Sequence, residues 1–450
     1  MSIILKDLDN NIIENCDLED DFINIMMINK YYCKIISNNK LFVEWKSFYC
    51  ETKKSRHRMR SMNFIFGYSC AYNFLCFSKY LFKKYYSPDL PAGSGSAEKY
   101  LYSINIHADN EYAFRESCRN GHLEMAKWLI GLKLIIKINI HAGYKNSDNE
   151  YAFRWACING HLAVAKWLVE LSKKTEYGLI NIHERVVPLS NTGDIFRNTC
   201  ENGQLEVAKW LLELSKEKEF GIIDINSHKE LNFIITCSTG HLDVAKWLLE
   251  LYKNYGLEFN NTRQIYSYTN HVYEEAFLGC CENGNLDVAK WLIELSREKD
   301  SNSILGLINI HVENEYAFRC SCQNGYINVA KWLIELSYKP EFGLIDIHVY
   351  KEEAFRLSCV HGRFIVAKWL IELSYQSEFG LINIHAEKEH AFRSSCRHGQ
   401  IEIVKWLINL SYKPEFGLID IRAKDNEVFN FNIDPEIKKL IGLIDYYIKK

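Results

Sequence analysis

Cysteine is the first residue type in this 450-residue sequence whose pattern could do chemistry, because thiolates ligate metals and form disulfides. Eight cysteines recur at similar intervals without any Cys-x-x-Cys pair: Cys118, Cys157, Cys200, Cys237, Cys281, Cys322, Cys359 and Cys396. If successive intervals stack as packed helices, equivalent cysteines lie about 10 Å apart, whereas a disulfide needs Cα atoms within about 7 Å. The pattern therefore favours core cysteines, and we expect no metal and no cofactor.

Histidine is the second candidate, because it closes an Ile-x-Ile-His segment in six intervals. These histidines are His107, His141, His183, His311, His348 and His385. Asn226 and Arg422 stand at the same place in two further intervals. All three residue types suit hydrogen bonding in a turn, whereas arginine does not suit a metal site. The segment therefore predicts turn hydrogen bonds.

Lysine is the third candidate, because a row of lysines could bind nucleic acid. The lysines that have glutamate four residues later are Lys166, Lys209, Lys246, Lys290, Lys331 and Lys368. This spacing neutralises the row along its own helix, and the whole chain has 54 Lys and Arg against 57 Asp and Glu. We expect a solvated face and no nucleic-acid partner. Nucleotide-binding loops, zinc-protease motifs and nucleophile elbows are also absent from the sequence, which predicts no enzyme.

The elements that carry these residues form one repeat. A lysine directly precedes a tryptophan in eight places, with spacings of 37 to 44 residues. The tryptophans are Trp128, Trp167, Trp210, Trp247, Trp291, Trp332, Trp369 and Trp406. Glycine stands seven residues before each tryptophan, cysteine ten before and phenylalanine fourteen before. Phenylalanine and cysteine are four apart and share a helix face, and glycine closes this first helix. The second helix has a wide apolar stripe, including the tryptophan, that only neighbouring repeats can bury. The pattern predicts an all-α solenoid of helix-turn-helix repeats.

These repeats resemble ankyrin repeats. The segment 121–130, Gly-His-Leu-Glu-Met-Ala-Lys-Trp-Leu-Ile, matches the second helix of that family, and Ile308-Asn309-Ile310-His311 matches its turn. The resemblance covers residues 100–450. The repeat sequences are similar to those of the divergent ankyrin proteins encoded by giant DNA viruses. The period is longer than the 33 residues of the family, which implies extended inter-repeat loops. Tyr-Ala-Phe-Arg at 151–154 replaces Thr-Pro-Leu-His, which implies longer and looser turns. The resemblance implies a monomeric scaffold with protein partners.

The repeat template also fits the apolar stretch near the N-terminus. Aligning Phe66 with the phenylalanine position places Cys70, Asn73 and Tyr80 at the cysteine, glycine and tryptophan positions. We therefore interpret 57–86 as a degenerate first repeat, although the uncharged run 62–78 is near the lower length limit for a membrane helix. The remaining predicted parts are a Pro/Gly/Ser loop at 87–99, eight regular repeats at 100–424 and a capping repeat at 425–450.

Residues 1–56 do not fit the template. The segments 17–36 and 41–45 resemble an F-box, which implies a Skp1-type adaptor contacted by Leu18, Phe22, Ile25 and Trp45. A plain helical cap satisfies the same apolar spacing and remains open. The acidic start of the chain is unlike a signal peptide, and this, with the cysteine content, favours the reducing cytoplasm. For a viral chain this means the host cytoplasm.

The expected partner site is the position five residues after each phenylalanine. This position lies about 140° around the first helix from the phenylalanine, and its occupants vary: Arg119, Ile158, Glu201, Ser238, Glu282, Gln323, Val360 and Arg397. We expect these residues and the turn tips before each phenylalanine to bind the partner on the concave face of the ankyrin-type solenoid. Three functions remain open, namely an adaptor that recruits a ubiquitin ligase, a simple binding or sequestering array and, last, an enzyme.

Overall fold

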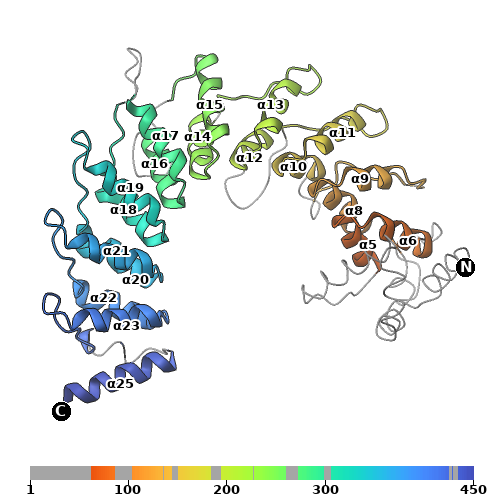
Figure 1. Ribbon diagram of the computed structural model, residues 1–450. Helices are drawn as coiled ribbons and strands as arrows, with labels where there is room; N and C mark the ends of the chain where they lie inside the picture. Colours follow the sequence, from red (N-terminus) through yellow and green to blue (C-terminus); the bar gives the residue numbers. More distant parts are fainter. Residues whose placement is uncertain are drawn as a thin grey trace, which may run out of the picture. The chain divides into compact units, whose positions relative to one another are not determined.

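The computed structural model describes residues 62–86, 104–134, 136–143, 150–183, 194–226, 228–259, 272–297, 306–424, 428 and 434–449. In these ranges the chain forms nine helix pairs and one C-terminal helix, and the only bridge between extended residues is the isolated one from Tyr86 to Ile104 (Figure 1). The predicted all-α repeat architecture is therefore confirmed. The predicted F-box-like segment 1–56 and loop 87–99 lie outside the described residues.

The chain divides into two compact units, which we call the N-terminal unit (residues up to 199, and 206–223) and the C-terminal unit (200–205 and 224–450). The helix pairs of the N-terminal unit are α5 (Met62–Ala71) with α6 (Leu75–Tyr85), α8 (Ala108–Arg119) with α9 (Leu123–Ile130), α10 (Tyr151–Ile158) with α11 (Leu162–Ser172), and most of α12 (Ile195–Glu201) with α13 (Leu205–Leu214). The first helices α5, α8 and α10 pack on one another in that order. The apolar run 62–78 thus belongs to two short helices joined by a turn, and no described helix is long and apolar enough to cross a membrane.

The C-terminal unit continues the same arrangement. Its pairs are α14 (Lys229–Ser238) with α15 (Leu242–Asn254), α16 (Val272–Asn283) with α17 (Leu286–Arg297), α18 (Val312–Asn324) with α19 (Ile327–Ser337), α20 (Val349–Val360) with α21 (Phe364–Ser374), and α22 (Ala386–Arg397) with α23 (Ile401–Ser411). First helices pack on first helices, and each second helix packs on its own partner. The last helix, α25 (Pro435–Lys449), packs on α23 and buries Ile437 and Ile441.

The phenylalanine and cysteine positions form the core of each repeat. Phe355 and Cys359, one turn apart on α20, are fully buried, and their equivalents in the other repeats are buried as well. Burial raises the pKa of the Cys70 thiol to about 12 and also raises the pKa of the Cys359 thiol. Both thiols therefore stay protonated and fill space as small apolar groups. The serine before the cysteine joins the repeats, because the Ser358 hydroxyl donates to the Cys322 carbonyl at 3.1 Å.

The glycine position requires glycine for two reasons, its backbone conformation and the lack of room for a side chain. Gly121 has a φ of 77°, which a residue without a Cβ adopts freely. A Cβ there would also lie 2.5 Å from the ring of His161 in the next repeat. Asn73 takes the equivalent place in the degenerate repeat with a φ of 61°, as the alignment predicts.

The tryptophans are less buried than the sequence suggests. Each lies on a second helix and is half-exposed. Seven of the eight rings pack against the phenylalanine of the preceding repeat, as Trp369 does against Phe318 at 6.3 Å between centroids. The tryptophans are therefore only partly buried, whereas the sequence predicted that neighbouring repeats bury them. The smaller Ala367 and Leu370 occupy the fully buried positions beside Trp369.

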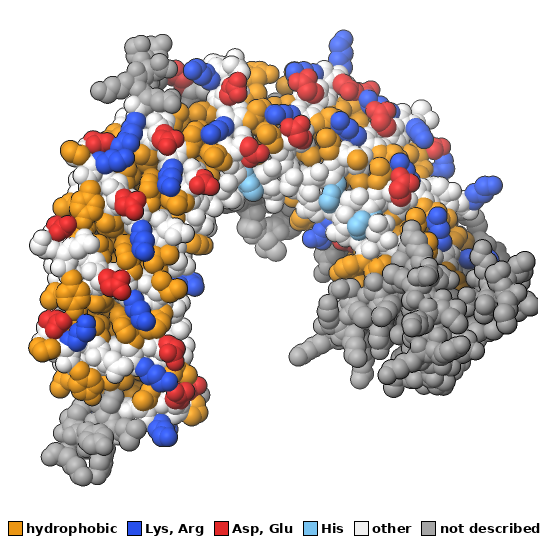
Figure 2. Space-filling model, viewed as in Figure 1, with side chains coloured by type: hydrophobic (Ala, Val, Ile, Leu, Met, Phe, Trp, Pro, Cys, Tyr) orange, Lys and Arg blue, Asp and Glu red, His pale blue; other side chains and the backbone are white. Residues whose placement is uncertain are grey.

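Over the C-terminal unit, Figure 2 shows exposed hydrophobic side chains interspersed with charged ones.

Candidate partner-binding surface

The first turn of four first helices, α8, α18, α20 and α22, has a non-helical backbone. Tyr350, Lys351 and Glu352 all have positive φ, at 49°, 56° and 63°. The same run of three occurs at 109–111, 313–315 and 387–389. Left-handed backbone costs roughly 1–2 kcal/mol for each such residue, so contacts elsewhere must hold these turns.

In these four helices, the arginine that follows the core phenylalanine supplies one set of contacts. The Arg356 guanidinium donates from Nε to the Lys351 carbonyl at 2.7 Å and from Nη2 to the Tyr350 carbonyl at 2.9 Å. Arg115, Arg319 and Arg393 bind the carbonyls of their own turns in the same way. One planar side chain therefore fixes two consecutive left-handed residues.

Histidine and glutamate supply a second set of contacts. His348 Nδ1 lies 2.9 Å from Glu352 Oε2, and its Nε2 lies 2.6 Å from the Phe379 carbonyl in the following loop. The Glu352 carboxylate also accepts the backbone N–H of Asn383 at 3.2 Å. The predicted turn hydrogen bonding by histidine is thus confirmed. The looser turns implied by the missing Thr-Pro-Leu-His stay a prediction, and this network ties the turn to the next repeat.

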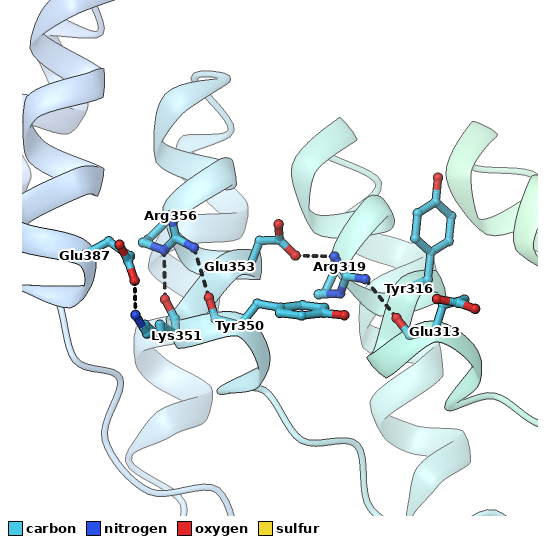
Figure 3. A pocket seen from close by; sticks show the side chains of 8 residues that line it. All are labelled: Glu313, Tyr316, Arg319, Tyr350, Lys351, Glu353, Arg356 and Glu387. Carbon is cyan, nitrogen blue, oxygen red and sulfur yellow. Dashed lines mark hydrogen bonds and ion pairs between the residues drawn. The ribbon is translucent and has the colours of Figure 1, made fainter. Parts of the chain in front are cut away.

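Successive turns of the C-terminal unit line an open surface pocket of about 620 Å³ (Figure 3). Its lining residues are Glu313, Tyr316, Arg319, Tyr350, Lys351, Glu353, Arg356 and Glu387, and we call this the turn pocket. Arg319 forms an ion pair with Glu353, and Lys351 forms one with Glu387. The Lys351 hydrogen bond lowers the pKa of Glu387, which keeps that carboxyl ionised. Tyrosine and arginine are enriched where proteins meet, so this lining suits the recognition of another polypeptide.

The Tyr350 side chain is the aromatic centre of the turn pocket. Its ring lies 4.8 Å from the Arg319 guanidinium carbon, and its hydroxyl accepts a hydrogen bond from Asn314 Nδ2 at 2.8 Å. The side chain is nevertheless 54% exposed. It therefore remains open to contact from a partner.

The equivalent surface of the N-terminal unit is more aromatic. The Tyr151 hydroxyl donates to Glu116 Oε1 at 2.9 Å and accepts from Arg119 Nη1 at 3.1 Å. The Arg115 guanidinium lies 4.6 Å above the Tyr151 ring, and that of Arg119 lies 4.5 Å above the Trp155 ring. Burial, with the charge of Glu116, raises the pKa of Tyr151 to about 12. We call these five residues the aromatic cluster.

The residues predicted at the position five after phenylalanine are only partly open. Ile158 is 7% exposed and Arg397 is exposed. The half-buried members are Arg119, Glu201, Ser238, Glu282, Gln323 and Val360. Their backbone carbonyls serve packing, since Asn159 Nδ2 donates to the Arg119 carbonyl at 2.8 Å.

Sequence reasoning missed the positions two before and two after phenylalanine, such as Tyr151 and Trp155. They lie about 160° and 200° around the helix from the core, which is closer to opposite than the chosen position at about 140°. The helical period alone could have identified them.

The predicted adaptor contacts lie outside the described residues. They are Leu18, Phe22, Ile25 and Trp45. Among the described residues, no group of three His, Cys, Asp or Glu is placed to hold a metal ion.

Comparison of the sequence with family models and with curated proteins finds no match. Among solved structures, 103 chains match. One is the crystal structure of the human ASB11 ankyrin repeat domain, with a TM-score of 0.31 and 16% sequence identity over 54% of this chain and 95% of that chain. The all-α helical-repeat architecture of this chain rests on the geometry above and not on this likeness.

Proposed function

We propose that this chain is a protein-interaction scaffold that holds a partner protein on its turns and first helices. The observation that carries the proposal is the turn pocket, which is built from three consecutive turns and lined by side chains that the repeat core does not use. A surface composed in this way can change its specificity without changing the fold.

Variation between repeats supports the same proposal. At the position two before phenylalanine, the first helices carry Tyr112, Tyr151, Tyr316, Glu353 and His390, whereas the phenylalanine position never varies. Packing therefore constrains one side of the first helix and leaves the other side free for recognition. The near balance of acidic and basic residues favours a protein partner over nucleic acid.

The more specific version of the proposal is an adaptor that recruits a ubiquitin ligase through residues 1–56. Its support is the resemblance of that segment to an F-box, with Leu18, Phe22, Ile25 and Trp45 facing a Skp1-type adaptor. The simpler version is an array that binds or sequesters a partner without recruitment. Both versions place a non-enzymatic protein in the cytoplasm, and in the host cytoplasm for a viral chain.

Affinity purification of the full chain with quantitative mass spectrometry tests the proposal. The double variant Tyr350→Ala with Lys351→Glu should lose the main partner at least tenfold relative to wild type. Lys331→Glu, an exposed change on the second helix α19, is the matched control and should retain it. Equal capture by all three chains would contradict the proposed surface.

A separate arm tests recruitment. Phe22→Asp should abolish capture of a Skp1-type adaptor and leave the main partner bound. Capture of the partner without any adaptor by the wild-type chain would favour the simple binding array.

A further inference from the structure

Four histidines in the turns have an acceptor at each ring nitrogen. His385 Nδ1 lies 2.7 Å from Glu389 Oε1, and its Nε2 lies 2.6 Å from the Phe416 carbonyl oxygen. His141, His311 and His348 make the same two contacts at 2.6 to 2.9 Å. In each case the carboxylate belongs to the same turn as the histidine and the carbonyl belongs to the loop of the following repeat. We call each such set a histidine clamp.

Counting protons gives the charge of the clamp. A carbonyl oxygen only accepts, so Nε2 must carry a proton. Glu389 Oε1 also accepts the backbone N–H of Asp420 at 3.1 Å. If this carboxylate is ionised, it can only accept, and Nδ1 must then carry a proton as well. A neutral imidazole has one N–H, which leaves one of the two contacts without a hydrogen. The alternative is a protonated glutamate that donates to Nδ1.

We propose that the four histidine clamps are imidazolium–carboxylate pairs, so that the attachment of each repeat to the next depends on a bound proton. This inference concerns the stability of the repeat stack and stands independently of the proposed partner.

Burial of the carboxylates supports the charged form. The second oxygens of Glu150, Glu315 and Glu389 are buried and have no hydrogen-bond partner. A buried carboxylate in this state is costly unless a cation lies beside it. An ionised carboxylate at these sites therefore needs the clamp histidine beside it in the protonated form.

The groups that face each histidine act in the same direction. For His141 the hydrogen bond to Glu150 raises the pKa, and burial opposes this less strongly. For His348 burial opposes the shift, but the Phe379 carbonyl, Glu352 and Asp346 together raise the pKa. For His385 burial again opposes, while the carbonyls of Phe416 and Gly417 and the Glu389 carboxylate raise it.

His311 follows the same pattern, with Glu315 and the Phe342 carbonyl raising its pKa against burial. On the same helix, α22, the charge of Arg393 interacts with Glu389, the carboxylate of the His385 clamp.

A histidine whose pKa is raised on folding contributes stability that is fully present below its unfolded pKa of about 6.5 and is lost as pH rises through the folded pKa. Four clamps in successive or nearby repeats add their effects. The repeat stack should therefore lose stability as pH rises from about 6.5 through the raised pKa values of these histidines.

Urea unfolding of the full chain between pH 6 and pH 9 tests the proposal. The wild-type midpoint should fall with rising pH, and Glu352→Gln should lower the midpoint at pH 6 more than at pH 9. Glu387→Gln makes the same chemical change at an exposed ion pair in the adjacent turn and should leave the pH dependence intact. If the glutamate carries the proton instead, the glutamine of Glu352→Gln can donate in its place. The variant would then have nearly the wild-type urea midpoint at pH 6, and this result would overturn the proposal.

Nuclear magnetic resonance of wild-type chain with ¹⁵N-labelled histidine rings provides a readout that needs no variant. At pH 7 the clamp histidines should show both ring nitrogens protonated. Ring signals of a single neutral tautomer at these four residues would also overturn the proposal.

Discussion

The aromatic cluster and the turn pocket occupy the same side of the repeat and differ in how they are held. In the aromatic cluster, Tyr151 is 7% exposed and is enclosed by two arginines and Glu116. In the turn pocket, Tyr350 is 54% exposed, and the charged pairs beside it lie near the solvent. The same repeat framework can therefore carry tyrosines in two roles. In the N-terminal unit Tyr151 stabilises the stack, and in the C-terminal unit Tyr350 is available to a partner.

The largest expected effect separates these two roles directly. Tyr151→Ala should lower the free energy of unfolding by about 3–5 kcal/mol, the usual range for a buried aromatic residue. Tyr350→Ala should change it by no more than about 0.5 kcal/mol, as surface substitutions do. Urea midpoints from circular dichroism measure both. Equal losses would mean that the turn pocket is part of the structural core.

The tryptophans give a second comparison between the units. Trp128 packs against Phe66 at 6.3 Å and edge-on against Phe82 at 5.9 Å, whereas Trp332 packs against Phe277 at 6.3 Å. Substitution by alanine should cost about 1.5–3 kcal/mol at each half-buried site, and about 0.5–1.5 kcal/mol more at Trp128 because of the additional aromatic contact. Chemical denaturation of the two variants decides this, and a larger loss at Trp332 would contradict it.

Removal of the Tyr151 hydroxyl tests how much its hydrogen bonds contribute to the stability of the aromatic cluster. Tyr151→Phe should cost about 1 kcal/mol, since it removes the hydrogen bonds to Glu116 and Arg119.

The same variant has a pH signature. The Tyr151 pKa of about 12 in the folded chain exceeds the usual value, so its contribution is present below a pH of about 10 and is lost as pH rises further. The wild-type advantage over the phenylalanine variant should therefore shrink at strongly alkaline pH. A constant difference up to denaturation would argue against the raised pKa.

The smallest effect on stability is expected at the turn pocket itself. Lys351 is 75% exposed in its ion pair with Glu387, and salt screens exposed pairs of this kind. Lys351→Ala should leave the thermal midpoint within error of wild type at low and high salt. A measurable loss would show that the exposed pairs hold the turns, in addition to the arginine and histidine contacts.

The sequence determined the repeat and its core. Phe355, Cys359 and Gly362 lie within one helix and its closing turn, so helical period and glycine conformation suffice to predict their roles. The alignment of Phe66 and Asn73 with the template worked for the same reason. Repetition of a local pattern also implied stacking, because a single helix pair cannot bury its own apolar stripe.

Tertiary structure alone decided the histidine clamps and the turn pocket. His348 and the Phe379 carbonyl are 31 residues apart, and Arg319 meets Glu353 only because two first helices stack. The left-handed turn at Tyr350, Lys351 and Glu352 contradicts local preference, and contacts from Arg356 and the next repeat compensate for it. A sequence pattern records what each residue prefers by itself, whereas these sites arise from contacts between repeats that outweigh that preference.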